Sequence, residues 1–398
     1  MKKILIILLS LWGGINLGMA NECQNTLSFD RWLNEFKQEA HHRGISLATL
    51  NATLNQLRYN PTIIKRDRRQ IQFAQRFDHF SAKLISPYRI KKGKRLMRKY
   101  RNLFATIERQ YGVPASVITA YWGLESSYGA VQGKFGTIRS LATLAYDCRR
   151  SSKFRPELLS ALAIIDRGDL RISEMRGAWA GELGQTQFLP SFYRQYAVDF
   201  DRDGRRDLIH SIPDVLASTA NYLKHAGWQR GKPWLEEVIL PKQMPWEQSG
   251  LEHSYSLDHW AKLGIKRRNR QPLKGRTEAS LLLPMGRNGV AFLVYANFKN
   301  VYLKWNESLL YSTTAAYFAT RLAGATKHKP ARAKIDSLSF QEIKKLQYLL
   351  RQRGYDIGEI DGIIGAKTRI AVKQIQKIYH LPADGYPTKR LLKRLQQR

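Results

Sequence analysis

The spacing of apolar residues along the chain predicts a mostly helical body. Apolar side chains recur at helical intervals between residues 27 and 57, and helix-like segments broken by polar turns continue to about Leu223. From Pro233 to Val301 the pattern changes to short apolar runs bounded by glycine, proline and asparagine, which predict strands or irregular segments. These runs cover residues 237–240, 279–283 and 290–295. With a last helical pattern from Ser312 to Leu322, the sequence predicts a mainly α body with a small mixed α/β lobe.

A change in composition after residue 325 marks a separate C-terminal unit. Residues 326–337 are rich in lysine, alanine, histidine and proline and show no apolar periodicity, which is typical of a linker. Residues 338–398 follow, and their apolar positions predict three short helices. Two Asp-Gly turns, at Asp361-Gly362 and Asp384-Gly385, each precede a helix and indicate a small internal repeat.

Residues 1–20 have the pattern of a secretion signal. Lys2 and Lys3 precede an apolar run from Ile4 to Trp12, and the small residues of Gly18-Met19-Ala20 fit a cleavage site. The apolar run is too short to span a bilayer comfortably, and no other segment is apolar enough to do so. We therefore expect export to the periplasm, with the mature protein either soluble or associated with the cell wall.

Export bears on Cys23 and Cys148, the two cysteines of the chain. An exported protein meets an oxidising compartment, so a disulfide between them is expected, with two buried free thiols as the alternative. Sequence alone does not establish that the two residues come within bonding distance.

The net charge narrows the class of partner. The 398-residue chain is 43% hydrophobic and 25% charged, an ordinary globular composition, yet its formal charge is +34. Because the basic residues are scattered along the chain, this charge implies a polyanionic partner: nucleic acid, an anionic membrane surface or the carboxylate-bearing cell wall. Charge alone does not choose among the three.

Glu125 is the first candidate for chemistry. It follows Tyr121 by four residues and Trp122 by three, so on a helix its carboxyl group shares a side with both aromatic rings. A carboxyl group in apolar surroundings is more easily kept protonated, as an acid catalyst for a glycosidic oxygen must be. By itself the pattern also fits a glutamate at the rim of an ordinary helix end.

A glycine-punctuated turn at residues 181–190 is the second candidate. Gln185, Thr186, Gln187 and Phe188 offer two amides, a hydroxyl group and an aromatic ring. These groups suit a sugar-binding groove, although a connection between two helices would also fit.

Taken together, these stretches closely resemble the lytic murein transglycosylase B family, glycoside hydrolase family 103. The matching residues are Trp122-Gly123-Leu124-Glu125, Tyr128-Gly129, 138–147, Arg149-Arg150, Trp179-Ala180-Gly181, Gly184-Gln185-Thr186-Gln187-Phe188, 197–201, 220–223, 291–295 and Trp305-Asn306. The resemblance covers roughly residues 25–325 in collinear order, and we assign residues 21–325 to this domain. It implies a lysozyme-like, mostly α-helical catalytic domain with an active-site cleft.

The resemblance also implies site residues. The family's single catalytic acid falls on Glu125. Its substrate-binding residues fall on Arg149, Arg150, Gln187, Phe188, Tyr222 and Tyr311. Many members carry a serine, thought to assist the reaction, where this chain has Ala178. We expect activity to be retained, whereas the resemblance does not fix the rate or the product ratio.

The implied reaction uses one carboxyl group where most glycosidases use two. Glu125 would protonate the oxygen between N-acetylmuramic acid and N-acetylglucosamine, then remove the proton of the same muramyl C6 hydroxyl group. A 1,6-anhydro ring would close without water, helped by the high effective concentration of an intramolecular hydroxyl group. No cofactor is required.

An acidic loop at residues 199–207 has the spacing of an EF-hand calcium site. Asp199, Asp201, Asp203 and Asp207 occupy positions 1, 3, 5 and 9, but His210 stands at position 12, where a glutamate is expected. Some members of the family bind calcium here. We therefore expect either a weak, structural calcium site or a loop whose aspartates are partly neutralised by neighbouring arginines.

The C-terminal unit resembles the three-helix peptidoglycan-binding domain of many wall hydrolases, and as a tether it would raise the local concentration of substrate. The expected partners are peptidoglycan strands and complexes of cell-wall synthesis or hydrolysis. A lysozyme-type hydrolase and a catalytically impaired wall-binding scaffold are the alternatives. Specific nucleic-acid binding rests on charge alone, and we do not expect it.

Overall fold

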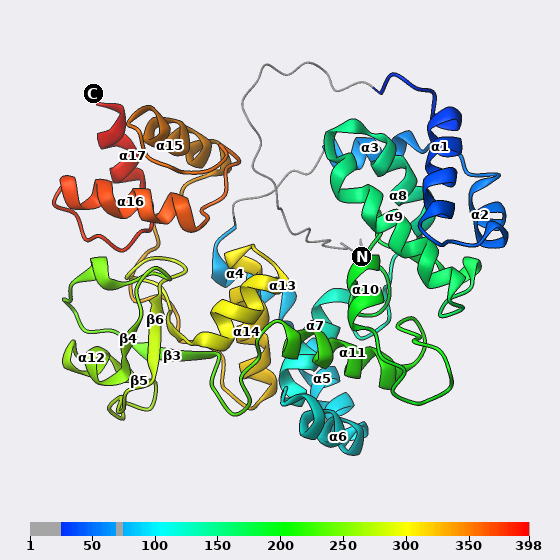
Figure 1. The fold of residues 1–398 in the computed structure, drawn as a ribbon. Coiled ribbons are helices and arrows are strands. Elements are labelled where there is room, and N and C mark those ends of the chain that lie inside the picture. The colour runs from blue at the N-terminus through cyan, green and yellow to red at the C-terminus, as the bar shows by residue number, and fades with distance from the viewer. Residues whose placement is uncertain (1–24, 69–74, 398) are drawn as a thin grey trace. The chain divides into compact units, whose positions relative to one another are not determined.

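The computed structural model describes residues 25–68 and 75–397, which divide into two units. The first comprises residues 25–68 and 93–225, and the second comprises residues 75–92 and 226–397 (Figure 1). The predicted signal peptide and Cys23 lie outside the described residues. None of the helices within those residues combines the length and the apolar character needed to cross a membrane.

The first unit is built almost wholly of helices. Its longer helices are α1 (Phe29–His42), α2 (Leu47–Leu54), α3 (Pro61–Arg68), α5 (Pro87–Lys99, which contains the division between the units), α6 (Arg101–Tyr111), α7 (Ala115–Ser126), α8 (Thr137–Tyr146), α9 (Ser151–Asp166), α10 (Pro190–Tyr196) and α11 (Ile212–His225). Short elements join them: β1 (Phe135–Gly136) pairs with β2 (Arg176–Gly177), and η1 (Cys148–Arg150) and η2 (Ile172–Glu174) are 3-10 turns. The predicted helical body is confirmed.

Helix α7 lies in the interior of the first unit. Nine of its twelve residues are buried, and the exceptions include Leu124 and Glu125 near its C-terminal end. A helix that is apolar on all sides belongs in a core, so its sequence fixes its place. Its final turn therefore brings a carboxyl group to the border of that core.

The second unit contains the predicted strands. Its antiparallel sheet has the order β4 (Tyr255–Ser256), β6 (Glu278–Leu282), β7 (Ala291–Val294), β3 (Leu235–Ile239) and β5 (Lys266–Arg267). Strand β7 is buried along its whole length, which explains a continuous apolar run in place of an alternating one. Before residue 338, the second unit also contains α4 (Phe77–Leu84), η3 (Trp246–Gln248), α12 (Leu257–Lys262), the π-helix η4 (Phe298–Tyr302), α13 (Leu303–Trp305) and α14 (Leu309–Leu322).

Three short helices form the C-terminal end, as predicted: α15 (Phe340–Gln352), α16 (Ala366–Ile378) and α17 (Lys389–Gln396). A capping box between Ser339 and Glu342 starts α15, and leucine, isoleucine and valine side chains from all three helices share one core. The segment ahead of α15 is held along the second unit. Lys329 N donates to Glu237 at 2.9 Å, and Arg332 N donates to Asn288 O at 2.8 Å.

Candidate active site

A left-handed turn fixes the end of α7 directly after Glu125. Ser127, Tyr128 and Gly129 have φ values of 53°, 62° and 78° in succession. Residues other than glycine rarely adopt this left-handed backbone conformation, and it persists only where surrounding contacts hold it. The amide of Tyr128 donates to Trp122 O at 3.0 Å, and that of Gly129 donates to Ser126 Oγ at 2.8 Å. The turn thereby fixes the backbone that carries Glu125.

Aromatic side chains support this helix end. The rings of Trp122 and Tyr128 meet edge to face, with their centroids 5.6 Å apart. A Cβ atom on Gly123 would lie 2.8 Å from the Tyr128 ring, so the close approach requires glycine. Tyr121 and Trp122 are almost fully buried. Glu125 is half-buried one helical turn further on, which agrees with the apolar side predicted from the spacing.

The glycine-punctuated turn lies against the end of α7. Gln185 Oε1 accepts a hydrogen bond from the Trp122 indole at 2.7 Å, and Gln185 Nε2 donates to Ile209 O at 3.0 Å. Gln187, with φ 54°, donates from Nε2 to Gln132 O at 3.1 Å. Two stretches that the sequence analysis singled out separately are therefore packed together. Gln185 was expected only as a sugar-binding amide, whereas in the structure its side chain joins Trp122 to Ile209.

Phe188 and Tyr222 belong to one aromatic cluster. Leu183 and Phe188 exchange two backbone hydrogen bonds of 2.8 and 2.9 Å, which close the turn and direct the Phe188 ring toward Tyr222 at 5.8 Å. Phe192 stacks on Tyr222 at 5.2 Å, and Tyr196 meets it edge-on at 5.0 Å. Burial raises the pKa of Tyr222 to about 12, so its hydroxyl group keeps its proton at neutral pH.

Arg149 and Arg150 share one carboxylate partner. Both guanidinium groups pair with Asp67 at the end of α3, and Asp67 itself is buried. The pairing orients both arginines while leaving Arg149 almost half exposed. Sequence reasoning missed Asp67, although it is the single acid in the basic run of residues 65–69. A lone acid in such a run is a signal for a structural ion pair.

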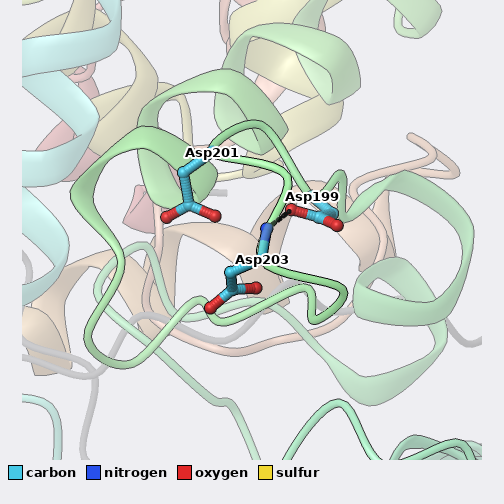
Figure 2. A group of neighbouring side chains, drawn as sticks. All are labelled: Asp199, Asp201 and Asp203. Carbon is cyan, nitrogen blue, oxygen red and sulfur yellow. Dashed lines mark hydrogen bonds between the residues drawn. The ribbon is translucent and has the colours of Figure 1, made fainter.

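The acidic loop brings three of its four aspartates together. One carboxylate oxygen from each of Asp199, Asp201 and Asp203 lies within 4.8 Å of the other two. Figure 2 shows the three side chains. Asp199 also accepts from Asp203 N at 3.1 Å, the bond drawn in that figure. Carboxylate oxygens at this spacing suit calcium. Asp207 is instead buried and accepts from Ile209 N and His210 N, which follow directly after the loop.

Two of the three loop arginines form ion pairs with acids outside the loop. Arg206 pairs with Asp169, and Arg205 pairs with Glu174 at 3.0 Å. Both partners are acids outside the loop, and partial neutralisation of the loop aspartates by neighbouring arginines stays an expectation.

Asp214 anchors the acidic loop, and the sequence analysis missed it. Its two carboxylate oxygens accept from Phe200 N at 2.7 Å and Asp207 N at 2.8 Å. Burial raises its pKa to about 6. The loop continues into Leu208, whose carbonyl group accepts from Gln185 N at 2.9 Å. The loop thus supports the turn that contacts α7.

The remaining predicted residues lie elsewhere. Tyr311 belongs to the second unit, where it is buried on α14. Ala178 is fully buried, and its amide donates to Glu182 O at 2.9 Å. Cys148 begins η1, directly before the two arginines, whereas Cys23 lies outside the described residues, so their pairing stays a prediction.

Comparisons with known proteins define the family. Residues 28–320 match the family described as "Transglycosylase SLT domain", and residues 340–395 match that described as "Putative peptidoglycan binding domain". Because the first match covers most of the chain, the chain belongs to the SLT-domain lytic transglycosylases, a family of enzymes that act on peptidoglycan. The predicted resemblance and the predicted lysozyme-like fold with a helical peptidoglycan-binding domain are confirmed.

Individual relatives give the same answer. Membrane-bound lytic murein transglycosylase B of Escherichia coli K12 is 33% identical over 236 residues, which are 58% of this chain and 63% of that protein. The chain thus spans less than two thirds of that relative. The crystal structure of SltB3 from Pseudomonas aeruginosa with NAG-anhNAM-pentapeptide has a TM-score of 0.87 and 40% identity, covering 93% of this chain and 99% of SltB3. Slt35 of E. coli in complex with calcium has a TM-score of 0.63 and 27% identity, covering 77% and 95%.

Proposed function

We propose that this chain is a lytic transglycosylase of peptidoglycan and that Glu125 acts first as its acid and then as its base. The observation that carries the proposal is the position of Glu125. It is half-buried at the end of a core helix that the 183–188 turn supports through Trp122, and a strained turn follows it directly. The relative SltB3 was crystallised with an anhydro-muramyl peptide, the form of product that this reaction would leave.

The reaction would proceed in two proton transfers. Glu125 donates its proton to the oxygen between N-acetylmuramic acid and N-acetylglucosamine while the bond from that oxygen to the muramyl C1 breaks. The ionised Glu125 then takes the proton of the C6 hydroxyl group as O6 bonds to C1. Glu125 ends protonated, as it began, and no water is consumed. Because the C6 hydroxyl group belongs to the same sugar and is held close to C1, its effective concentration exceeds that of water as a competing nucleophile.

The other predicted residues would bind substrate. Arg149 and Arg150, oriented by Asp67, suit muramyl or peptide carboxylates and N-acetyl oxygens. Gln187, Phe188, Tyr222 and Tyr311 would contact sugar hydroxyl groups and ring faces. Of these, the amide nitrogen of Gln187 is already bound to backbone carbonyl groups, so its oxygen is the atom available to a ligand hydroxyl group.

A calcium ion fits the acidic loop as a structural group. Asp199, Asp201 and Asp203 would hold it, and its charge would offset the repulsion among their carboxylates. A calcium complex of the related Slt35 supports this assignment. The loop's own role is to support Gln185 through Leu208.

The proposed setting is the cell wall outside the cytoplasm. Residues 1–20 would direct export, residues 21–325 would cleave the glycan, and residues 338–398, after the linker 326–337, would bind the wall. A net charge of +34 favours association with wall carboxylates.

Mass spectrometry of soluble products tests the proposal. Purified peptidoglycan is incubated with the mature protein or with Glu125→Gln. We expect muropeptides one water lighter than those of lysozyme, and at least a thousandfold less product from the variant, because one group performs both transfers. Reducing-end products would indicate a hydrolase. No product from either protein, with co-sedimentation retained, would favour a wall-binding scaffold.

A further inference from the structure

Helix α5 carries a dense positive charge that no acidic residue of its own segment offsets. Residues 79–107 contain nine lysines and arginines and no aspartate or glutamate. Seven of these nine cations lie on α5, whose thirteen residues include one buried residue, Gly93. The proposed reaction uses none of them. This helix is therefore a part of the +34 charge that catalysis leaves unexplained.

The charges of α5 gather on one side of the helix, which is labelled in Figure 1. Lys91, Arg95 and Arg98 are exposed and follow one another at intervals of four and three residues, so their side chains project from the same side. Tyr88 begins this stripe three residues before Lys91, and it is 73% exposed. The buried Gly93 lies on the opposite side of the helix. We call Tyr88, Lys91, Arg95 and Arg98 the α5 face, and all four lie on one continuous helix.

The cations of the α5 face repel one another. Residues three or four apart on a helix are neighbours, about 5–6 Å apart at Cβ, and like charges at this spacing destabilise the helix. Across residues 25–68 and 75–397, Lys91, Arg95 and Arg98 have no acidic partner in an ion pair to offset this repulsion. A polyanion bound along the face would offset it.

The shape and composition of the α5 face favour a lipid surface among the polyanions. The face is a stripe about 15 Å long, since ten residues separate its ends and each adds about 1.5 Å. A planar leaflet of lipid phosphates can contact all the cations of such a stripe at once. The phenol group of Tyr88 combines an apolar ring with a hydroxyl group, which suits the boundary between lipid headgroups and acyl chains. Nucleic acid and wall peptides offer negative charge without that boundary.

We propose that the α5 face binds the surface of a membrane that contains anionic phospholipids. Lys91, Arg95 and Arg98 receive phosphate oxygens of the lipid headgroups, and the Tyr88 ring lies at the depth of those headgroups. The contact inserts one ring only, so it is peripheral, reversible and weakened by salt. This surface adds a membrane partner to the proposed action on the cell wall.

Sedimentation of the full-length mature protein with lipid vesicles tests the proposal. The vesicles consist of phosphatidylcholine alone, or of equal parts of phosphatidylcholine and phosphatidylglycerol, in about 0.15 M salt. The α5 variant replaces Lys91, Arg95 and Arg98 by glutamine, which keeps a high helix propensity. A matched control loses the same net charge from three exposed cations of the second unit: Lys262→Gln, Lys274→Gln and Arg276→Gln.

The wild type should bind the mixed vesicles and not those of phosphatidylcholine alone. The Kd of the α5 variant for mixed vesicles should rise about a hundredfold, because each cation near an anionic surface contributes roughly fivefold to the affinity. The control should stay within about fivefold of the wild type, because charges away from the contact are screened. Tyr88→Ala should weaken binding less and keep the wild-type salt dependence, because it removes a ring and no charge.

The outcomes are separable from the proposed function, because the vesicles contain no peptidoglycan. Equal Kd values of the α5 variant and its control for mixed vesicles would overturn the proposal, as would a wild type that does not bind them. A loss by the α5 variant of equal factor on a DNA duplex or on sacculi would make the face a general anion site and overturn its assignment to lipid. Thermal unfolding checks that the variants fold. If the α5 variant unfolds, Arg95→Gln and its control Lys274→Gln give the same comparison, with an expected difference of about fivefold.

Discussion

Replacing Glu182 by glutamine should stabilise the protein at neutral and alkaline pH, and the gain should disappear in acid. Glu182 lies in the turn before Gln185, and its carboxyl group is buried. Among residues 25–68 and 75–397, its Oε2 atom has no hydrogen-bond partner. This burial raises the pKa of Glu182 from 4.5 to about 7, opposed only in part by backbone hydrogen bonds and by the charge of Lys153. The folded protein therefore prefers the protonated, neutral form.

The size of the effect follows from the two pKa values. Below pH 4.5 the carboxyl group is protonated in both the folded and the unfolded state, and it costs nothing extra. Between pH 4.5 and about 7 only the unfolded state releases its proton, so the free energy of unfolding falls. Because one pKa unit corresponds to about 1.4 kcal/mol, the loss amounts to about 3 kcal/mol and stays constant at higher pH. Glutamine cannot ionise and avoids this loss.

Thermal unfolding at a series of pH values measures the difference. A change of about 3 kcal/mol corresponds to roughly 6–12 °C in Tm for a unit of this size. The Tm of Glu182→Gln minus that of the wild type should rise by this amount between about pH 4 and pH 8. Any pH-independent effect of the glutamine amide on stability changes the Tm difference equally at pH 4 and pH 8. The change of that difference with pH is therefore the quantity that tests the prediction.

Glu174 provides a control of opposite sign. Although burial acts to raise it, its bonds to Arg171 and its proximity to Arg205 lower the pKa of Glu174 to about 2. Its contribution to stability is therefore present above pH 4.5 and is lost as the pH falls toward 2. Glu174→Gln should lower the Tm near neutral pH and converge with the wild type in acid. Parallel pH curves for Glu182→Gln and the wild type would refute the reasoning about Glu182.

Three further changes probe the ion pairs and the acidic loop. Asp67→Asn removes the carboxylate shared by Arg149 and Arg150. The KM for soluble glycan should therefore rise about tenfold, with a smaller change in kcat. An unchanged KM would show that the arginines do not bind substrate. Calcium at a hundred times its Kd should stabilise the wild type by about 2.7 kcal/mol, measured as a rise in Tm. A chelator should remove this gain, and Asp201→Asn should abolish it. Equal shifts in Tm for the wild type and Asp201→Asn would place the ion elsewhere. Lys373→Met removes a buried cation of α16 that binds the carbonyl groups of Glu247 and Ser249 and the carboxylate of Glu252. Proteolysis at residues 326–337 should therefore accelerate about tenfold relative to the exposed control Lys377→Met. Equal rates would mean that Lys373 does not hold the C-terminal helices in place.

The elements were predictable because their signals are local. The continuous apolar runs at residues 279–283 and 290–295 correspond to β6 and β7, and both strands are buried in the sheet core. The Asp-Gly turns at Asp361 and Asp384 indicated the repeat, because the turn residue and the following helix are adjacent in sequence. Periodicity and turn chemistry act over a few residues, and a single sequence records them directly.

The partners of the site residues were not predictable, because they come from distant parts of the chain. Asp67 reaches arginines about eighty residues later, and Gln185 reaches back to Trp122. Nothing in the spacing of the acidic loop shows that Asp214, beyond the expected glutamate position, accepts its backbone amides. Arg206 likewise pairs with Asp169 and not with the loop aspartates that are closer in sequence, and this pairing depends on tertiary packing.

These long-range bonds explain why an acidic loop without a reacting group matters to the proposed chemistry. Asp214 fixes the loop backbone, and Leu208 O receives Gln185 N. The Gln185 side chain in turn receives the Trp122 indole, one helical turn before Glu125. Each link is a hydrogen bond between buried or nearly buried groups, where a broken bond is costly. Disorder in the loop would therefore act on the position of Glu125, and its signature would be a lower kcat with an unchanged product mass.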